Sequence, residues 1–210
     1  MTGHLLGGWV VLAVAAWSAP RAILAQAPPL VAGVIGGYTT TKHVWSPDAD
    51  AHGVAGLVLG GFVDVQTPLS WLTAGAEATY SQRGSDVMLD GGGMSVPGGI
   101  RADYLTFMIR VRAALALGPA RLHVAGGPMT DFVIRSRLDA LLIQVLEEER
   151  AAPFGVSAGA GVGVFVTSST FVEVEARIVE GLQAAYAGDL ISVRSRSREL
   201  VARVGLLVGR

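Results

Sequence analysis

Strict alternation of apolar and polar residues runs along most of the chain after residue 30. Between residues 154 and 166, valine and alanine hold one set of positions, while glycine, serine and Phe165 hold most of the other. Successive side chains of a β-strand point to opposite faces of a sheet, so this pattern predicts strands with one apolar face. Eight such segments are expected, at 31–39, 54–65, 71–83, 101–117, 121–134, 154–166, 171–182 and 198–209.

The glycines of the sixth segment also suggest a phosphate-binding loop, which is the main alternative for this stretch. A dinucleotide fingerprint needs its glycines between a strand and a helix, whose N-terminus then meets the pyrophosphate. Here Gly159, Gly161 and Gly163 are spaced by two and lead into further β-branched residues, and the only lysine of the chain is Lys42. We therefore expect a strand with a small inner face, and no nucleotide or other cofactor.

The connections between the segments alternate in length. Short turns lie at 66–70, 118–120 and 167–169, and long connections, among them 40–53 and 84–99, separate the other segments. This order is typical of an up-and-down transmembrane β-barrel, which has tight turns at one end and longer loops at the other. Pro128, in the middle of the fifth segment, predicts a bulge or kink at 126–128 because it removes a ladder hydrogen bond.

Every charge in the middle of a segment lies on the polar face. A charge on the lipid-facing side at mid-bilayer costs about 2 to 4 kcal/mol, so a barrel in lipid requires this separation. A soluble barrel or sandwich would show the same periodicity with its apolar face inward, and periodicity alone does not say which face is inside. Low total charge and the small polar face of the sixth segment favour polar residues inside.

The fold class expected is therefore all-β, an eight-stranded antiparallel up-and-down transmembrane β-barrel. Its lumen is predicted to hold an internal network of ion pairs and hydrogen bonds, because unpaired charges there would be costly. The members of that network are Glu77, Arg83, Arg110, Arg112, His123, Asp131, Glu173, Glu175, Arg177 and Arg203. The expected aromatic girdle residues are Trp71, Tyr80, Tyr104, Phe107 and Phe171.

Composition agrees with a membrane location. Hydrophobic residues make up 51% of the 210 residues and charged residues 16%. The net charge is -1, so the chain lacks the excess of basic residues that a nucleic-acid-binding surface needs. Residues 5–16 form an apolar run of secretory length followed by small residues, so we expect a signal peptide at 1–25 and a barrel domain at 26–210, exported to the outer membrane. The run is too short to span a bilayer as a helix, and a retained anchor helix is the alternative.

Candidate chemistry is sparse. The chain has no cysteine, hence no disulfide or thiolate metal site. His43 and His52 flank Asp48 and Asp50 in the first long connection, but the spacing of a defined metal site is absent, so a solvated loop is expected. We predict no catalytic, cofactor or metal residue. His123 with the lumen carboxylates leaves a lipid-modifying enzyme as a distant alternative.

The third long connection breaks the strand pattern. Apolar residues within 138–150 recur at helical spacing and end in three glutamates. This periodicity predicts a short amphipathic helix. The helix would either cap the barrel mouth or dock a partner protein, and the sequence does not separate the two.

Five stretches resemble the PorT/OmpX-like family of small outer-membrane β-barrels, in order along the chain. They are GVIGGYTT at 33–40, AEATYSQRGSDV at 76–87, DYLTFMIRVRAAL at 103–115, VAGGPM at 124–129 and VEVEARIVEGL at 172–182. Members of this family end in an insertion signal, whose spacing Arg203, Gly205 and Val208 match. Arg210 stands where the family has a terminal aromatic residue.

The resemblance implies a non-enzymatic outer-membrane barrel with a structural, adhesive or narrow small-solute role. The alternative that it implies is a PorT-like secretion or envelope-assembly factor that acts through partner proteins bound at its loops. Expected partners are outer-membrane lipid, the barrel assembly machinery during insertion and an envelope protein at the loops, and no nucleic acid.

Overall fold

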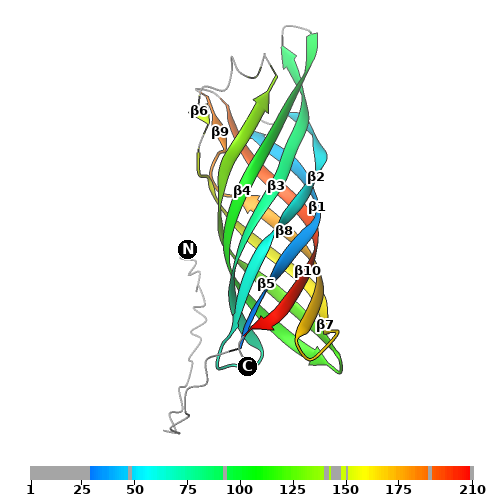
Figure 1. The fold of residues 1–210 in the computed structure, drawn as a ribbon. Helices are drawn as coiled ribbons and strands as arrows, with labels where there is room; N and C mark the ends of the chain where they lie inside the picture. Colours follow the sequence, from blue (N-terminus) through cyan, green and yellow to red (C-terminus); the bar gives the residue numbers. More distant parts are fainter. Residues whose placement is uncertain are drawn as a thin grey trace, which may run out of the picture.

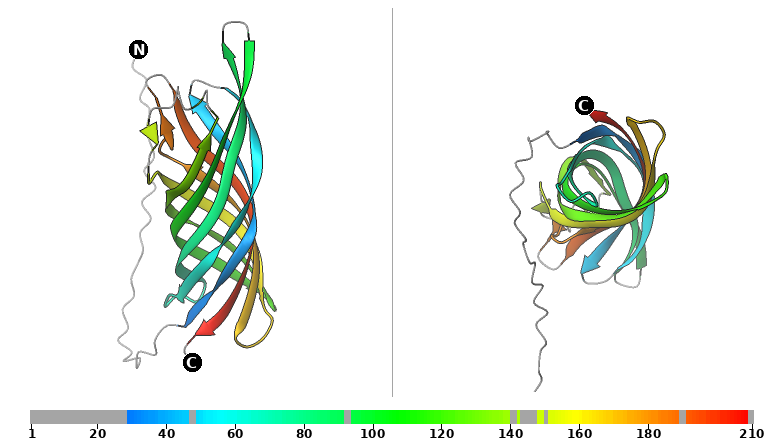
Figure 2. Two further views of the ribbon diagram at one scale, coloured as in Figure 1. Left: turned by 45° about the horizontal axis from the view of Figure 1, so that its top comes forward. Right: turned by 90° about the horizontal axis from the view of Figure 1, so that it is seen from below.

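The computed structural model describes residues 29–46, 49–91, 94–139, 142, 148–149, 151–188 and 191–208. Its eight long strands are β1 (Leu30–Ser46), β2 (Asp50–Gln66), β3 (Leu72–Gly91), β4 (Met94–Leu117), β5 (Ala120–Leu138), β7 (Phe154–Phe165), β8 (Thr170–Gly181) and β10 (Ser192–Val208). Each pairs antiparallel with the next, and β1 also pairs with β10, so the sheet closes into a ring (Figures 1 and 2). The predicted eight-stranded up-and-down barrel is confirmed.

Two further strands are only two residues long. β6 (Glu148–Glu149) pairs with β9 (Tyr186–Ala187), which in turn pairs antiparallel with the start of β10. Both lie at the end of the barrel where the long connections are, opposite the short turns (Figure 1). We call these two ends the long-connection end and the short-turn end.

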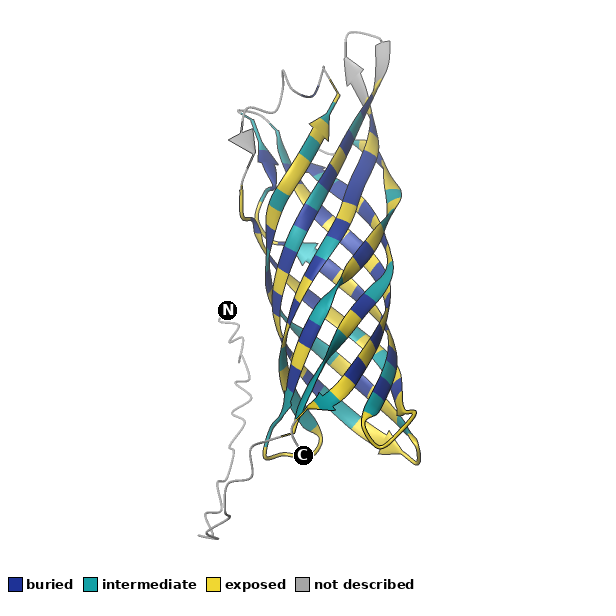
Figure 3. Cartoon of the chain, viewed as in Figure 1, coloured by how far each residue is buried: buried dark blue, intermediate teal, exposed yellow. Residues whose placement is uncertain are grey.

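Most of the apolar side chains are on the outside of the ring, and two small buried apolar clusters lie inside it. Ile109 is 67% exposed and Val34 64%, whereas Arg110 and Glu175 are each 2% exposed and face the lumen. Figure 3 shows this alternation of buried and exposed positions along every long strand. The alternative with the apolar face inward is wrong, because the closed ring turns its charged side chains toward one another and its aliphatic side chains outward.

Exposed aliphatic residues form a continuous band around the barrel, here called the apolar belt. Its members include Val34, Leu59, Val63, Ile109, Val111, Leu115, Val124, Val162, Val174, Ile178, Leu200, Val204 and Leu206. A belt of this kind faces lipid hydrocarbon in transmembrane barrels. Among the described residues, no helix is long and apolar enough to cross a membrane.

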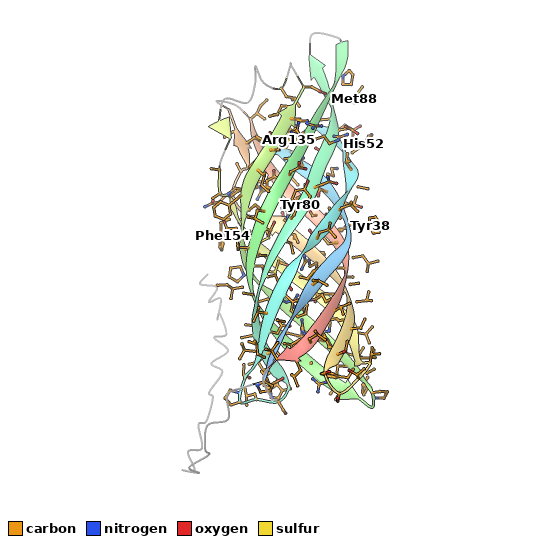
Figure 4. All side chains as sticks on the ribbon, viewed as in Figure 1. Tyr38, His52, Tyr80, Met88, Arg135 and Phe154 are labelled. Atoms are coloured by element: carbon orange, nitrogen blue, oxygen red, sulfur yellow. The ribbon has the colours of Figure 1, made fainter. Side chains whose placement is uncertain are left out.

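Aromatic residues mark the two edges of the belt only in part as predicted. Tyr38 and Tyr80 face outward at the edge nearer the long-connection end (Figure 4), and Trp71 is 52% exposed at the short-turn end. Tyr104 and Phe171 are only 1% and 7% exposed, so their predicted girdle role is wrong. Each lies on the inward set of its strand, where alternation places it beside the lumen charges.

The strands run further than the alternation predicts. β1 continues to Ser46 and β3 to Gly91, so the predicted loops at 40–53 and 84–99 are wrong for most of their length. β10 likewise begins at Ser192 rather than near 198. Beyond the belt, outward positions meet water and are mostly polar or charged, although backbone pairing continues. The apolar and polar pattern therefore stops before the strand does.

Pro128 does not produce the predicted bulge. Pairing between β4 and β5 lapses opposite Gly127 and Pro128, but the register is the same on both sides of the gap. The shift in register lies instead between Asp103 and Tyr104. On its other side Pro128 is paired with Val156 of β7. A proline that lacks one ladder bond is thus accommodated without an extra residue.

Several predicted features lie outside the described residues. They are the signal peptide at 1–25, Arg210 and most of the helix predicted at 138–150, of which Leu138, Asp139, Leu142, Glu148 and Glu149 are described. The signal peptide and Arg210 therefore stay predictions. The helix does not span its whole predicted range, because Leu138 ends β5 and Glu148–Glu149 form β6.

Replacing Val111 by arginine should test the position of the lipid boundary. Val111 is half exposed in the middle of the belt on β4, and its arginine variant should lose about 2 to 4 kcal/mol of unfolding free energy in lipid vesicles. Gln82→Arg, at an exposed outward position beyond the belt, should change that free energy by less than about 1 kcal/mol. Urea titration followed by tryptophan fluorescence measures both, and equal losses would contradict the placement.

Candidate functional site

The lumen is filled by charged side chains from six strands. All ten residues of the predicted network are buried: Glu77, Arg83, Arg110, Arg112, His123, Asp131, Glu173, Glu175, Arg177 and Arg203. The structure adds two carboxylates that the prediction missed, Asp64 on β2 and Glu199 on β10. Both stand at inward positions of their strands, so alternation alone could have found them.

Arg110 of β4 links two carboxylates in the middle of the lumen. Its Nη1 donates to Glu77 of β3, and its Nη2 donates to Glu175 of β8. Arg177 of β8 donates from Nη1 to the second oxygen of Glu77 at 2.7 Å, and from Nε to Glu199 of β10 at 2.6 Å. These bonds join strands on different sides of the ring through their side chains.

A second group of ion pairs lies nearer the short-turn end. Arg203 of β10 donates to Glu173 at 3.0 Å and to Asp64 at 3.1 Å. Arg112 of β4 approaches the same two carboxylates, with 3.2 Å from its Nη2 to each. Arg203 also lies 3.3 Å from Glu77, so this group is continuous with the one in the middle.

A third group lies toward the long-connection end. Arg83 of β3 donates to Asp131 of β5 at 2.6 Å and to the hydroxyl of Thr106 at 3.2 Å. Thr106 in turn donates to the other oxygen of Asp131 at 2.5 Å. The guanidinium of Arg83 also lies 5.1 Å from the ring centre of Tyr104, within cation–π range.

His123 of β5 sits between two carboxylates. Its Nε2 is 3.0 Å from Glu175, and its Nδ1 is 3.5 Å from Glu173. The strand beside it makes room, because a Cβ on Gly161 of β7 would stand 2.6 Å from the Cε1 of His123. The glycines on the inner face of β7 thus leave room for two side chains to lie against this strand. They are the ring of His123 at Gly161 and the Cβ of Arg177 at Gly159.

The charges of the lumen nearly cancel. Within the described part of the chain, the buried groups that make up the network are six carboxylates (Asp64, Glu77, Asp131, Glu173, Glu175, Glu199) and five guanidinium groups (Arg83, Arg110, Arg112, Arg177, Arg203). His123 faces a carboxylate with each ring nitrogen. Near neutrality reduces the cost of placing so many charges inside a membrane protein.

The same cluster has the residue types of a metal site. Ligand atoms of His123, Glu173 and Glu175 lie within 4.8 Å of one another. One oxygen of each glutamate already accepts from arginine, however, since Arg203 binds Glu173 and Arg110 binds Glu175. A cation held by the remaining ligand atoms would lie beside these guanidinium groups and be repelled by them, so the arrangement favours internal ion pairing over metal binding.

The two ends of the lumen differ. At the short-turn end a pocket of about 330 Å³ opens toward Asp64 and Arg112. At the long-connection end an apolar cluster closes the interior. It consists of Trp45, Ala51, Val87, Ile100, Leu142, Ala185, Tyr186 and Val193. We call it the apolar cap.

The first long connection is not the solvated loop that the sequence predicts. His43 is fully buried in β1, and its Nδ1 lies 2.8 Å from the hydroxyl of Ser85 on β3. His52 is exposed on β2 and projects from the outer wall (Figure 4), so the two histidines are on opposite sides of the sheet. Asp48 lies outside the described residues. Alternation within a continuing strand separates side chains that a loop would have allowed to meet.

The sequence matches no protein-family model, and no curated protein matches it. Solved structures with a similar fold include Neisserial surface protein A, at 11% identity and a TM-score of 0.48, covering 82% of this chain and 96% of that one. Ail of Yersinia pestis, in complex with the heparin analogue sucrose octasulfate, has 9% identity and a TM-score of 0.43, covering 84% and 98%. The N-terminal β-barrel domain of Pseudomonas aeruginosa OprF has 10% identity and a TM-score of 0.38, covering 86% of this chain and 99% of that one. Likeness at this level says nothing about activity.

Replacing Arg110 by alanine should destabilise the barrel strongly. The change leaves Glu77 and Glu175 without their shared partner in a buried site, which costs about 3 to 5 kcal/mol of unfolding free energy. Arg101→Ala, on the same strand, removes an exposed pair with Asp86 (2.7 Å) and should cost less than about 1 kcal/mol. Urea unfolding in vesicles compares the two variants, and similar losses would refute a structural role for the network.

Burial of His43 should make stability depend on pH. This residue lies beyond the apolar belt, where burial and then the charges of Arg83 and Arg101 lower its pKa from 6.5 to about 4. Between these two values the unfolded chain binds a proton that the folded chain does not, so stability should fall as pH falls from 6.5 toward 4. The thermal midpoint of His43→Gln should fall less over this interval than that of the unaltered protein. Identical slopes would contradict the assignment.

Proposed function

We propose that the chain is a non-enzymatic outer-membrane β-barrel that does not conduct and that acts through its long-connection end. The observation that carries this proposal is the filled lumen. Ion pairs join side chains across its whole middle section, and the apolar cap covers them on one side. A solute could enter the pocket at the short-turn end, but it would meet the network at Arg112 and Asp64.

The long-connection end supports an adhesive or structural role. The β3–β4 hairpin pairs without interruption out to Gly91 and Met94 and projects beyond the other strands (Figures 1 and 2). Gly91 is eleven residues past Tyr80, which lies at the belt edge, so the hairpin follows roughly 35 Å of strand away from the belt. A rigid barrel that holds such a hairpin outside the membrane suits contact with another surface.

A second candidate is a PorT-like secretion or envelope-assembly factor. The same projecting hairpin supports it, since a partner protein could pair with or pack on that element. Recovery of one envelope protein with the intact chain, but not with a chain whose hairpin is cut back near Asp86, would favour this candidate over adhesion. The outer-membrane lipid and the assembly machinery are partners of either candidate.

Lipid-modifying activity has less support. A general base must reach the proton that it removes. Both ring nitrogens of His123 already face carboxylates, and the side chain is 1% exposed inside the lumen, away from the lipid. An enzyme that uses His123 would therefore need both the substrate and the ion pairs to move.

Planar-bilayer recording tests the closed lumen. The unaltered protein, checked for a closed barrel by its shift in gel migration on heating, should insert without steady conductance. A Glu77→Ala, Arg110→Ala and Trp45→Ala variant removes both lumen side chains and part of the cap, and should conduct wherever it still shows the heat shift. Steady conductance of the unaltered protein at a level like that of the variant would refute the proposal.

A further inference from the structure

The outer wall carries a basic surface where β1 and β10 meet, just beyond the apolar belt. Moving away from the belt, Tyr38 is paired with Leu200, and the next outward pairs are Thr40 with Arg198, Lys42 with Arg196, and Val44 with Arg194. All four cations are exposed. We call Lys42, Arg194, Arg196 and Arg198 the basic patch.

The patch lies at the height of lipid head groups. On β10 the outward residues from Leu200 to Val208 are apolar, and these nine residues match the length with which a tilted strand crosses the hydrocarbon layer. Arg198 is the first outward residue past this stretch. Tyr38, 69% exposed on the neighbouring strand, marks the same boundary, because tyrosine favours the interface between hydrocarbon and water (Figure 4).

Most of the positive charge of the patch is unneutralised. Arg196 donates to both oxygens of Glu180 on β8, at 2.5 and 3.0 Å. Among the residues that the structure describes, no carboxylate lies within ion-pair distance of Lys42, Arg194 or Arg198. The four cations and the one carboxylate together give this surface a net charge of +3.

The opposite side of the barrel differs at the same height. On β3, β4 and β5 the outward charges are of both signs, with Arg101 paired to Asp86 at 2.7 Å and Arg135 directly opposite Asp103 in the register. Together with Arg137, these residues make a group of five whose net charge is only +1. The excess of positive charge is therefore a feature of the β1–β10 seam and not of the whole rim.

We infer that the basic patch binds the phosphate-bearing head groups of anionic lipids in the leaflet at the long-connection end. Guanidinium groups present paired donors that match phosphate oxygens, and lysine adds a point charge. The apolar belt directly below holds the acyl chains of the same lipids against Leu200 and Tyr38. This inference goes beyond the proposed function: it rests on the membrane-spanning fold and is independent of whether the lumen conducts.

Lipid retention by the full-length barrel tests the inference. The protein is reconstituted in nanodiscs of phosphatidylcholine that contain a small share of phosphatidic acid, and the lipids retained after extraction are counted by native mass spectrometry. Each cation near an anionic surface contributes about a five-fold preference at low ionic strength. The Lys42→Gln, Arg194→Gln and Arg198→Gln variant, which keeps the Arg196–Glu180 pair, should therefore retain at least about ten-fold less phosphatidic acid.

The matched control removes three cations from the opposite side. An Arg101→Gln, Arg135→Gln and Arg137→Gln variant has the same change in net charge. Arg101 and Arg135 already face Asp86 and Asp103, so only Arg137 contributes an unneutralised charge and retention should fall by no more than about five-fold. Heat-shifted migration on gels confirms that both variants are folded. Equal losses in the two variants, or no loss in the first, would overturn the inference. Full displacement of the lipid by soluble glycerol phosphate would also overturn it, because the patch would then be a site for dissolved phosphates.

Discussion

Pairing of β1 with β10 is the constraint on which the rest of the structure depends. Inside hydrocarbon no water is present to satisfy backbone donors and acceptors, so a sheet can cross a membrane only if it has no free edge. Seventeen residue pairs, from Leu30 with Val208 to Ser46 with Ser192, remove that edge here. Once the ring is closed, each strand has one side facing lipid and one facing a narrow interior, and the sequence alternates accordingly.

The narrow interior explains the chemistry of the lumen. An eight-stranded ring leaves a space that side chains just fill, so charges from opposite walls come within bonding distance of one another. Arginine suits this space because its guanidinium group can bind two carboxylates at once, as Arg110 does with Glu77 and Glu175. The glycines of β7 supply the volume that these long side chains and His123 need. The result is a polar core that stabilises the ring from within, while the apolar cap packs above it.

Much of this arrangement could be predicted from the sequence, because a period of two assigns each residue to a wall of the barrel. Residues such as Arg110 and Glu175 were placed by that rule alone. Which charges pair could not be predicted, since pairing depends on the register of strands that are distant in the sequence, as with Arg203 and Asp64. The ends of the strands were also beyond reach, because outside the belt Lys42 and Arg196 follow the pairing of the backbone and not the apolar pattern.

The length of β4 has a mechanical consequence. This strand runs unbroken from the tip of the projecting hairpin at Met94 to the short turn at Leu117, and β3 pairs with it from Met94 to Ala113. A force pulling on the hairpin tip is directed along these strands, so it loads many cross-strand bonds in shear at the same time and does not peel them apart one by one. The wall of the barrel is therefore suited to resist tension between the membrane and any surface to which the tip were bound.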